Sequence, residues 1–313
     1  SFVGGAELNT GSFVQDENNF NSLSTSIFEK INGQVNALLF SGSDLYVGGD
    51  FTQIGEKLIN RIARWDGAEW NAVGSGLNEH VRTLLLSGSD IYAGGEFTST
   101  SDNTVSVSRV AKWDGLNWSA VGGGFNNTVM TLLLSGSDIY AGGDFTTTGS
   151  RVSQWDGLNW NAVGSGLNQR VNILLLSGSD IYAGAESGFG VFQWNGSSWS
   201  GVGSGFNGSV RSLLFSGSDI YAGGFFTSAS NNTVSVSRVA KWDGLNWNPV
   251  GDGFNNAVFT LLLSGSDIYA GGGFTTTGSG VSQWDGLNWN SVGGGFRGTV
   301  QTLLLSGSDI YAG

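Results

Sequence analysis

The sequence has no cysteine, and it has one proline, one methionine and one histidine among its 313 residues. Without cysteine, disulfides and thiolate metal sites are excluded. A single proline excludes proline-rich linkers, and the 53 glycines follow no collagen-like period. No apolar run approaches the roughly 20 residues of a membrane-spanning helix, so we expect no membrane insertion.

Charged residues are also scarce, at 12% of the chain, and they are mostly acidic, giving a net charge of -12. The 13 lysines and arginines are spread singly along the chain. Nucleic-acid binding needs a basic stripe that releases counterions from phosphate, so no nucleic-acid partner is expected. Hydrophobic residues make up 39% of the chain, which is enough for a sizeable core.

The abundant feature is an internal repeat of roughly 45 residues. Every tyrosine lies in the pattern Ser-Gly-Ser-Asp, apolar residue, Tyr, and the twelve tryptophans form two columns of six. The tetrapeptides begin at Ser41, Ser87, Ser135, Ser177, Ser216, Ser264 and Ser306. The first column is Trp65, Trp113, Trp155, Trp194, Trp242 and Trp284, and the second is Trp70, Trp118, Trp160, Trp199, Trp247 and Trp289.

Each unit divides into four strand-sized pieces. In one unit, the apolar run 129–134 is closed by a Ser-Gly-Ser-Asp turn, whose Asp is expected to cap backbone amides. Residues 138–146 form the second strand, with small residues where neighbouring backbones approach closely. Residues 151–155 and 159–163 are the third and fourth strands, joined by an Asp-Gly hairpin turn. No window shows a helical period, so helix content should be close to zero.

Four short antiparallel strands per unit predict an all-β fold, a β-propeller. A degenerate copy near the N-terminus, with Ser12-Phe-Val-Gln as third strand and Phe20 at the second Trp position, predicts seven four-stranded blades. The ring would be closed by pairing C-terminal strands (300–305 and 309–313) with strands from residues 12–24. We expect one domain over residues 1–313, with units at about 2–45, 46–91, 92–139, 140–181, 182–220, 221–268 and 269–310, and residues 311–313 closing the ring.

A longer period lies above the short one. Residues 92–139 closely match 221–268, and 140–181 match 269–310, both with an offset of 129 residues. This near-identity indicates duplication of a three-blade block. We therefore expect most repeated residues to serve packing, and few to form a specialised site.

The pattern Trp-Asp-Gly-x-x-Trp-x-x-Val-Gly-x-Gly, then Val-x-x-Leu-Leu, then Ile-Tyr-Ala-Gly-Gly-x-Phe-Thr resembles kelch-like propeller repeats over essentially the whole chain. It looks most similar to repeats in secreted bacterial proteins and in the fungal cortical cell-polarity marker. The resemblance implies an extracellular or cell-surface location and a binding or scaffolding role, and it brings no catalytic residues to this sequence.

Four acidic residues after the Gly-Gly element are candidate ligand-binding residues: Asp50, Glu96, Asp144 and Glu186. They could gather at one end of the central channel and bind a cation or sugar hydroxyls. The alternative is a solvated strand end, which we favour. The aspartates of the seven Ser-Gly-Ser-Asp turns could line a calcium ring, but each turn offers one carboxylate, so turn capping is favoured and no cofactor is expected.

Two long loops, residues 98–108 and 227–237, are the other candidate surface, since binding usually sits in loops on a rigid scaffold. Their polar residues are Asp102, Asn103, Asn231 and Asn232. The single histidine, His80, lies in a loop and reads as an ordinary surface residue.

Together these features predict a non-catalytic, extracellular or cell-surface propeller in an adhesion, matrix or filament role, acting through contacts with other proteins or with itself. The alternative is a multivalent lectin that stacks sugars on tryptophans. A third hypothesis is that the protein is a carboxylate-dependent glycoside hydrolase.

Overall fold

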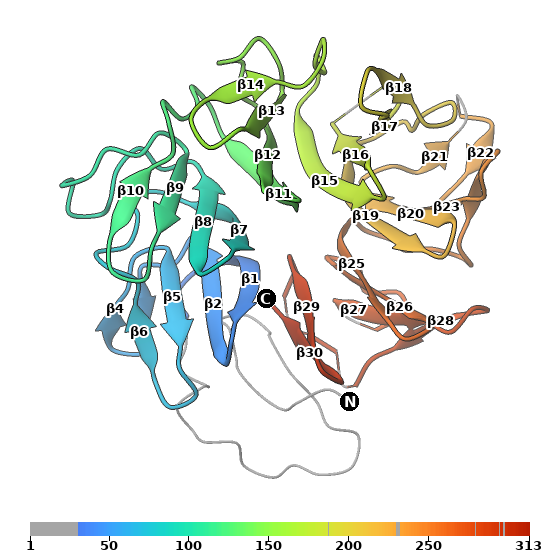
Figure 1. Cartoon of the computed structure of the whole chain (residues 1–313). Coiled ribbons are helices and arrows are strands. Elements are labelled where there is room, and N and C mark those ends of the chain that lie inside the picture. Colours follow the sequence, from blue (N-terminus) through green and yellow to red (C-terminus); the bar gives the residue numbers. More distant parts are fainter. Residues whose placement is uncertain (1–30, 187, 230–231, 279, 294, 297) are drawn as a thin grey trace.

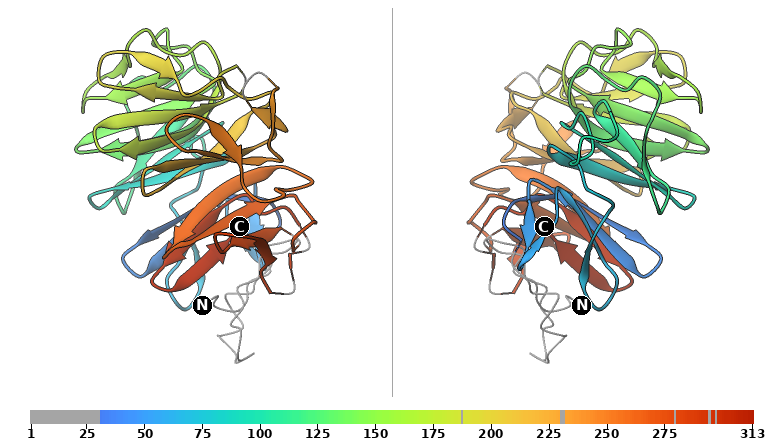
Figure 2. Two further views of the ribbon diagram at one scale, coloured as in Figure 1. Left: turned by 90° about the vertical axis from the view of Figure 1, so that its right-hand side faces the viewer. Right: turned by 90° about the vertical axis from the view of Figure 1, so that its left-hand side faces the viewer.

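The structure is a computed structural model that describes residues 31–186, 188–229, 232–278, 280–293, 295–296 and 298–313. Every regular element in these residues is a β-strand, as expected from the missing helical period, and none of their segments is a helix that could cross a membrane. The sheets stand radially around one axis (Figure 1), and side views show them stacked face to face (Figure 2). The fold is a β-propeller.

Six sheets have four strands, ordered from the axis outward. Blades one to three are β1 (Val35–Ser41), β2 (Asp44–Gly49), β5 (Ile62–Trp65), β6 (Trp70–Ala72); β7 (Val81–Ser87), β8 (Asp90–Gly95), β9 (Val110–Trp113), β10 (Trp118–Ala120); and β11 (Val129–Ser135), β12 (Asp138–Gly143), β13 (Val152–Trp155), β14 (Trp160–Ala162). Blades four to six are β15 (Val171–Ser177), β16 (Asp180–Ala185), β17 (Val191–Trp194), β18 (Trp199–Gly201); β19 (Val210–Ser216), β20 (Asp219–Gly224), β23 (Val239–Trp242), β24 (Trp247–Pro249); and β25 (Val258–Ser264), β26 (Asp267–Gly272), β27 (Val281–Trp284), β28 (Trp289–Ser291).

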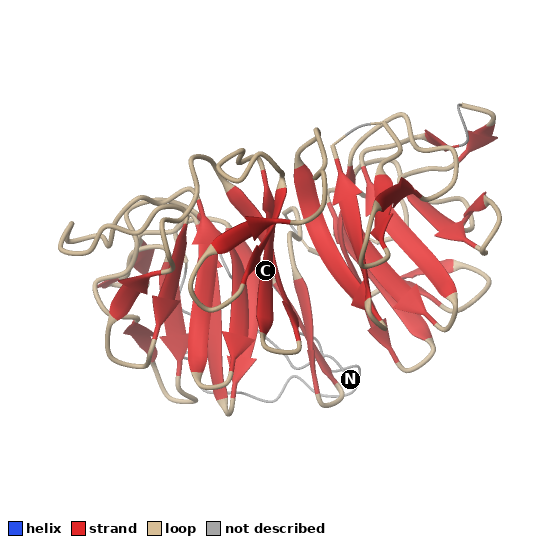
Figure 3. Cartoon of the chain, turned by 45° about the horizontal axis from the view of Figure 1, so that its top comes forward, coloured by secondary structure: helices blue, strands red, loops and turns tan. Residues whose placement is uncertain are grey.

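Loops and turns connect these strands at both ends of the blades (Figure 3). Two of the loops between a second and a third strand form small hairpins, β3 (Gln53–Ile54) with β4 (Lys57–Leu58) and β21 (Ser228–Ala229) with β22 (Val234–Ser235). The repeat units predicted from the sequence are offset from the blades. The unit 46–91, for example, supplies most of β2, all of β5 and β6, and then β7 of the next blade.

The prediction of seven four-stranded blades was wrong, because the described residues form six. The remaining sheet in the described part of the chain has two strands, β29 (Leu303–Ser306) and β30 (Asp309–Ala312). It lies between the sixth and first blades, where Phe40 meets Tyr311 edge to face at 5.2 Å. The seventh copy was counted from residues that lack both the Trp pair of the six blades and their Asp-Gly or Asn-Gly turn. The closing strands expected at residues 12–24 lie outside the described residues.

Adjacent blades are joined by the indoles of the second Trp column. Trp118 Nε1 donates to the carbonyl of Val73 in the preceding blade at 2.9 Å. The same bond, at 2.9–3.0 Å, joins Trp160 to Val121, Trp199 to Val163, Trp247 to Val202 and Trp289 to Val250. The buried Nε1 of Trp70 has no acceptor among the described residues, where the neighbouring sheet β29–β30 has no fourth strand. These tryptophans are therefore struts between sheets.

Close approach of the blades explains an invariant glycine on each second strand. A Cβ added at Gly94 would lie 2.6 Å from Cγ1 of Val129 in the next blade. At the end of the chain, a Cβ at Gly313 would lie 2.7 Å from Cγ1 of Val35 in the first blade. The predicted need for small residues at this position is confirmed, and the last strand packs on the first blade in the same way.

The hairpin turn predicted from the Asp-Gly pair joins the third and fourth strands, and the side chain of its aspartate also caps the turn. Asp156 Oδ1 accepts from the backbone amides of Leu158 and Asn159, both at 2.8 Å. These bonds lower the pKa of Asp156 below its usual value. The Ser-Gly-Ser-Asp aspartate was expected to cap backbone amides, but Asp138 instead accepts from the third-strand side chain of Gln154 at 2.6 Å.

Candidate functional site

Every inner strand of the six blades starts with a β-bulge. In the second blade Val81 pairs with Gly95 and Thr83 with Gly94, so the residue between them is left without a partner on β8. A bulge re-aims the side chain of the extra residue. The bulge residues are Asn36, Arg82, Met130, Asn172, Arg211 and Phe259.

The residue that follows each second strand lies at the same end of its blade, because the start of the inner strand pairs with the end of the second. These residues are Asp50, Glu96, Asp144, Glu186, Phe225 and Gly273. We call the bulge residues together with these six the inner rim. It contains all four acidic residues that the sequence selected after Gly-Gly.

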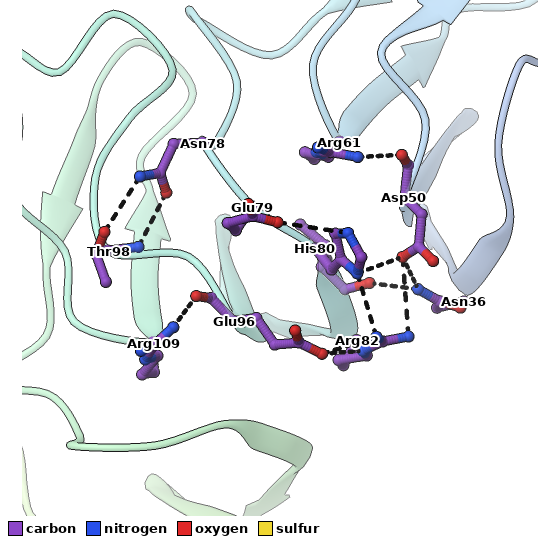
Figure 4. A network of polar contacts seen from close by, with 11 residues as sticks. Asn36, Asp50, Arg61, Asn78, Glu79, His80, Arg82, Glu96, Thr98 and Arg109 are labelled. Atoms are coloured by element: carbon purple, nitrogen blue, oxygen red, sulfur yellow. Dashed lines mark hydrogen bonds and ion pairs between the residues drawn. The ribbon is translucent and has the colours of Figure 1, made fainter.

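Arg82 joins two of those acids into one network across the first two blades (Figure 4). Its Nε and Nη2 donate to Glu96 Oε1 at 2.9 and 2.7 Å, and its Nη1 lies 3.8 Å from Asp50 Oδ1. Asp50 Oδ1 also accepts from Asn36 Nδ2 at 2.8 Å and lies 3.3 Å from His80 Nδ1. The structure thus brings Asp50 and Glu96 together around a guanidinium, and His80 belongs to the same network.

The other two acids are also paired with arginines. The Arg151 guanidinium contacts the carboxylate of Asp144 and donates to its carbonyl at 2.6 Å. Glu186 Oε2 lies 3.3 Å from Arg170 Nε and 4.0 Å from Arg211 Nη2. Each candidate carboxylate therefore lies within 4 Å of an arginine of this chain, with Arg82 shared by Asp50 and Glu96, which favours a rim of ion pairs over an open cation site.

A second set of arginines, just before the third strand, was missed by the sequence reasoning. Arg61, Arg109 and Arg238 have left-handed φ angles of 65°, 68° and 69°. Their guanidinium groups donate to the carbonyls of Asp50, Glu96 and Phe225. At the same position, directly before the third strand, the fourth and sixth blades have Gly190 and Gly280. Because this position holds only Arg or Gly in the six blades, the sequence could have indicated its role. These residues hold the rim backbone in place.

The rim changes character around the ring. In the fifth and sixth blades the residues after the second strand are Phe225 and Gly273, and the bulge residue of the sixth is Phe259. The two phenylalanine rings meet edge to face at 5.4 Å, and Phe225 is 41% exposed. The rim therefore carries an acidic residue after the second strand in each of the first four blades, whereas in the last two blades Phe225 and Phe259 lie beside Arg211.

The duplicated blocks diverge at this rim. Between 92–139 and 221–268, Glu96 corresponds to Phe225 and Met130 to Phe259, while most other residues are identical. Between 140–181 and 269–310, Asp144 corresponds to Gly273, Arg151 to Gly280 and Asn172 to Gln301, and the other differences lie at the end of the fourth strand, in the linker that follows it and at the third residue of the inner strand. In the repeated Val-x-x-Leu-Leu pattern, the residue directly after Val is the bulge residue, and it varies from blade to blade. This variation indicated the bulge position, but the sequence analysis did not use it.

The long-loop candidates bond within their own loops. Asp102 Oδ1 accepts from Thr100 Oγ1 at 2.6 Å and from the amide and hydroxyl of Thr104 at 3.1 and 2.8 Å, which lowers the pKa of Asp102 to about 2. Asn103 and Asn232 both adopt left-handed φ angles. Asn231 lies outside the described residues. Asp102 thus acts as a turn cap. Among the described residues, the side chains of the two long loops form no hydrogen bond to the acids of the rim.

Sugar stacking on the second Trp column is disfavoured by burial. Trp70 and Trp247 are among the largest fully buried side chains, and Trp118 and Trp289 are also buried. Their faces pack against phenylalanines and the first Trp column inside the blades, as for Trp289 with Phe254 at 4.6 Å. In the described part of the chain, no three His, Cys, Asp or Glu side chains are grouped as metal ligands.

A scan against protein-family models and a search of curated proteins found no match. Among solved structures, the chain is similar to the computationally designed Ika8 protein, with TM-score 0.61 and 18% identity over 90% of this chain and 82% of that one. It is similar to the extracellular domain of the putative hybrid two component system BT4673 from B. thetaiotaomicron, with TM-score 0.57 and 15% identity over 88% of this chain and 35% of that one. The WD40 β-propeller domain of Doa1 matches with TM-score 0.53 and 14% identity over 75% and 74%. These similarities establish a propeller of repeated blades.

Proposed function

We propose that this chain is a non-catalytic binding propeller whose inner rim contacts another protein. The observation that carries the proposal is the divergence of nearly identical blades at that rim. Glu96 and Phe225 occupy equivalent places on equivalent strands, yet one is charged and the other aromatic. A change from a charged to an aromatic side chain at an equivalent place on a repeated scaffold is the pattern expected of a contact surface.

The chemistry of the rim fits a protein partner. Arginine and aromatic side chains contribute most strongly to protein interfaces, and both types gather here. Arg82 and Arg170 are held by carboxylates within the chain, so little side-chain freedom is lost on binding. The rim is carried by inner strands of a closely packed ring, which provides a preorganised platform.

As part of the same proposal, the protein acts outside the cell or at its surface. Support comes from the resemblance of the repeat to kelch-like units of secreted proteins, and from one similar structure that is an extracellular domain. Fractionation of source cells with an antibody against the chain tests this location. Recovery in the cytosol alone would contradict it.

The partner surface can be tested with variants at the two ends of the blades. The intact chain, immobilised through its C-terminus, is incubated with extract from its source, and bound proteins are quantified by mass spectrometry. Glu96→Lys changes the rim, whereas Asp267→Lys makes the same charge change at the opposite end of a blade, at the first residue of β26. We expect Glu96→Lys to abolish capture of a specific protein and Asp267→Lys to retain it.

A glycan array run with the same chain separates the alternatives. Equal capture by both variants would contradict a rim interface. Saturable binding to a defined sugar, with no rim-dependent protein capture, would replace the proposal with the lectin reading.

A further inference from the structure

The three-blade duplication places two equivalent arginines, Arg82 and Arg211, on the bulges of the second and fifth blades. Arg82 stands between two carboxylates. Glu96 of its own blade accepts two hydrogen bonds at 2.9 and 2.7 Å, and Asp50 of the preceding blade lies 3.8 Å away. At Arg82, the guanidinium is therefore paired with carboxylates of two neighbouring blades.

Arg211 has lost the closer of those two partners. The residue at the place of Glu96 is Phe225, whose ring centroid lies 5.3 Å from the guanidinium carbon. The carboxylate of the preceding blade, Glu186, is 4.0 Å away and lies closer to Arg170, at 3.3 Å. The bond from Nη1 to Asn172 Oδ1 is long, at 3.4 Å. Nε is buried and has no acceptor among the described residues.

The charge around Arg211 is correspondingly unbalanced. Glu186 is the one carboxylate shared by Arg170 and Arg211, which leaves an excess positive charge. Arg82 belongs to β7, which lies across the axis from the strand of Arg211, β19 (Figure 1), and it also contributes a positive field at Arg211. Burial first, and then Arg170 and Arg82, lower the pKa of Arg211. Because an unmet donor and an excess cation coincide, the site favours an anion.

The neighbourhood of Arg211 on its other side is apolar. Phe225 and Phe259 meet edge to face, and Gly273 follows in the next blade. An anion bound to the partly exposed guanidinium would lie beside two aromatic rings, which suits a carboxylate attached to an apolar group better than a free inorganic ion. A guanidinium fork also matches the planar geometry of a carboxylate.

We propose that Arg211 binds a carboxylate from outside the chain, whose adjoining apolar group packs on Phe225 and Phe259. This carboxylate pairs with the Arg211 guanidinium as Glu96 pairs with that of Arg82. This inference rests on the proposed function for its source, a side-chain or C-terminal carboxylate of the protein partner.

The direct test uses N-acetylphenylalanine as the probe and N-acetylphenylalaninamide as its uncharged match. Both are titrated into the ¹⁵N-labelled intact chain while the Nε–Hε signals of the arginines are followed by NMR. We expect the acid to shift the Arg211 signal saturably and the amide to bind roughly tenfold more weakly or not at all. The Arg82 signal, already paired with Glu96, should move little.

Phe225→Glu is the decisive variant, because it restores to Arg211 the carboxylate that its duplicate possesses. We expect this variant to fold, since Glu96 occupies the equivalent position, and to lose the acid binding by roughly tenfold or more. Arg211→Gln should lose it as well. Lys241→Gln removes a cation that pairs with Asp219 at the opposite end of the blade, and should leave affinity unchanged.

Equal binding of acid and amide, or acid binding that survives Phe225→Glu in a folded protein, would overturn the inference. That outcome leaves the protein interface standing, because Glu96→Lys tests the interface independently. If the interface fails while the acid still binds at Arg211, the site accepts free small carboxylates instead of a partner's.

Discussion

Trp247 Nε1 donates a 3.0 Å hydrogen bond to the carbonyl of Val202, and this bond spans two blades inside the core. Trp247 is fully buried. Trp247→Phe should destabilise the protein by about 1–3 kcal/mol, because the Val202 carbonyl would lose its donor without gaining water. Guanidinium unfolding measures the change. Trp242→Phe, in the half-buried first column, is the matched control, and an equal loss in both variants would contradict the strut role.

Gly94→Ala should destabilise the ring by about 1–3 kcal/mol, because the added methyl group would overlap Val129 and Thr83 between two blades. The control is Gly123→Ala, whose Cβ would meet nothing within 4 Å and whose duplicate is Asp252. We expect the control to stay within about 0.5 kcal/mol of the parent. Thermal unfolding of both variants provides the comparison, and equal midpoints would show that the blades can move apart.

Arg238→Ala should be less stable than Arg238→Gly by about 1 kcal/mol. Both variants lose the bond from the guanidinium to the Phe225 carbonyl, but only glycine removes the cost of the left-handed backbone at φ 69°. Gly190 and Gly280 adopt this conformation in two other blades, at φ 70° and 85°. Equal unfolding midpoints for the two variants would show that the backbone relaxes when the bond is absent.

The hairpin aspartates should contribute to acid sensitivity. Backbone hydrogen bonds from Asn159 and Leu158 lower the pKa of Asp156 in the folded chain, so the stabilisation is present above the unfolded pKa of roughly 4 and is lost as the pH falls through the lower folded value. Asn195 fills the same role in the fourth blade with bonds of 3.0 Å from two amides, and it does not titrate.

Asp156→Asn should therefore flatten the fall in melting temperature below pH of roughly 4, while keeping the turn. Asp252→Asn makes the same charge change at an exposed linker residue and is the control. Melting temperatures measured from neutral to acid pH test the pair. Parallel curves for the parent and Asp156→Asn would contradict a titrating turn.

The fold could be predicted from the sequence wherever one side chain has one structural task. Trp118, Gly94 and Asp156 recur because each blade needs an interblade strut, a close backbone approach and a tight hairpin. The blade count could not be predicted in this way, because it relied on a copy without these residues. Phe20 was matched to the second Trp position because both residues are aromatic, but phenylalanine has no indole N–H with which to form the bond between blades.

The rim was predicted only in part. The acidic residues were identified as candidates because they follow the Gly-Gly element. The arginines that pair with them were not identified. Arg82 reaches Glu96 because a bulge turns its side chain out of the strand alternation, and such a bulge leaves the Val-x-x-Leu-Leu pattern unchanged. Ion pairs between blades depend on the ring, which no local pattern encodes.

The offset between repeat unit and sheet has an evolutionary consequence. Each unit closes one sheet and opens the next, as residues 46–91 do with β5, β6 and β7. If a whole number of units is copied, every new strand therefore has a neighbouring strand with which to pair, wherever the copied segment begins. A genome can lengthen such a ring in single steps that each preserve every hydrogen-bonded ladder, and then modify one rim residue at a time.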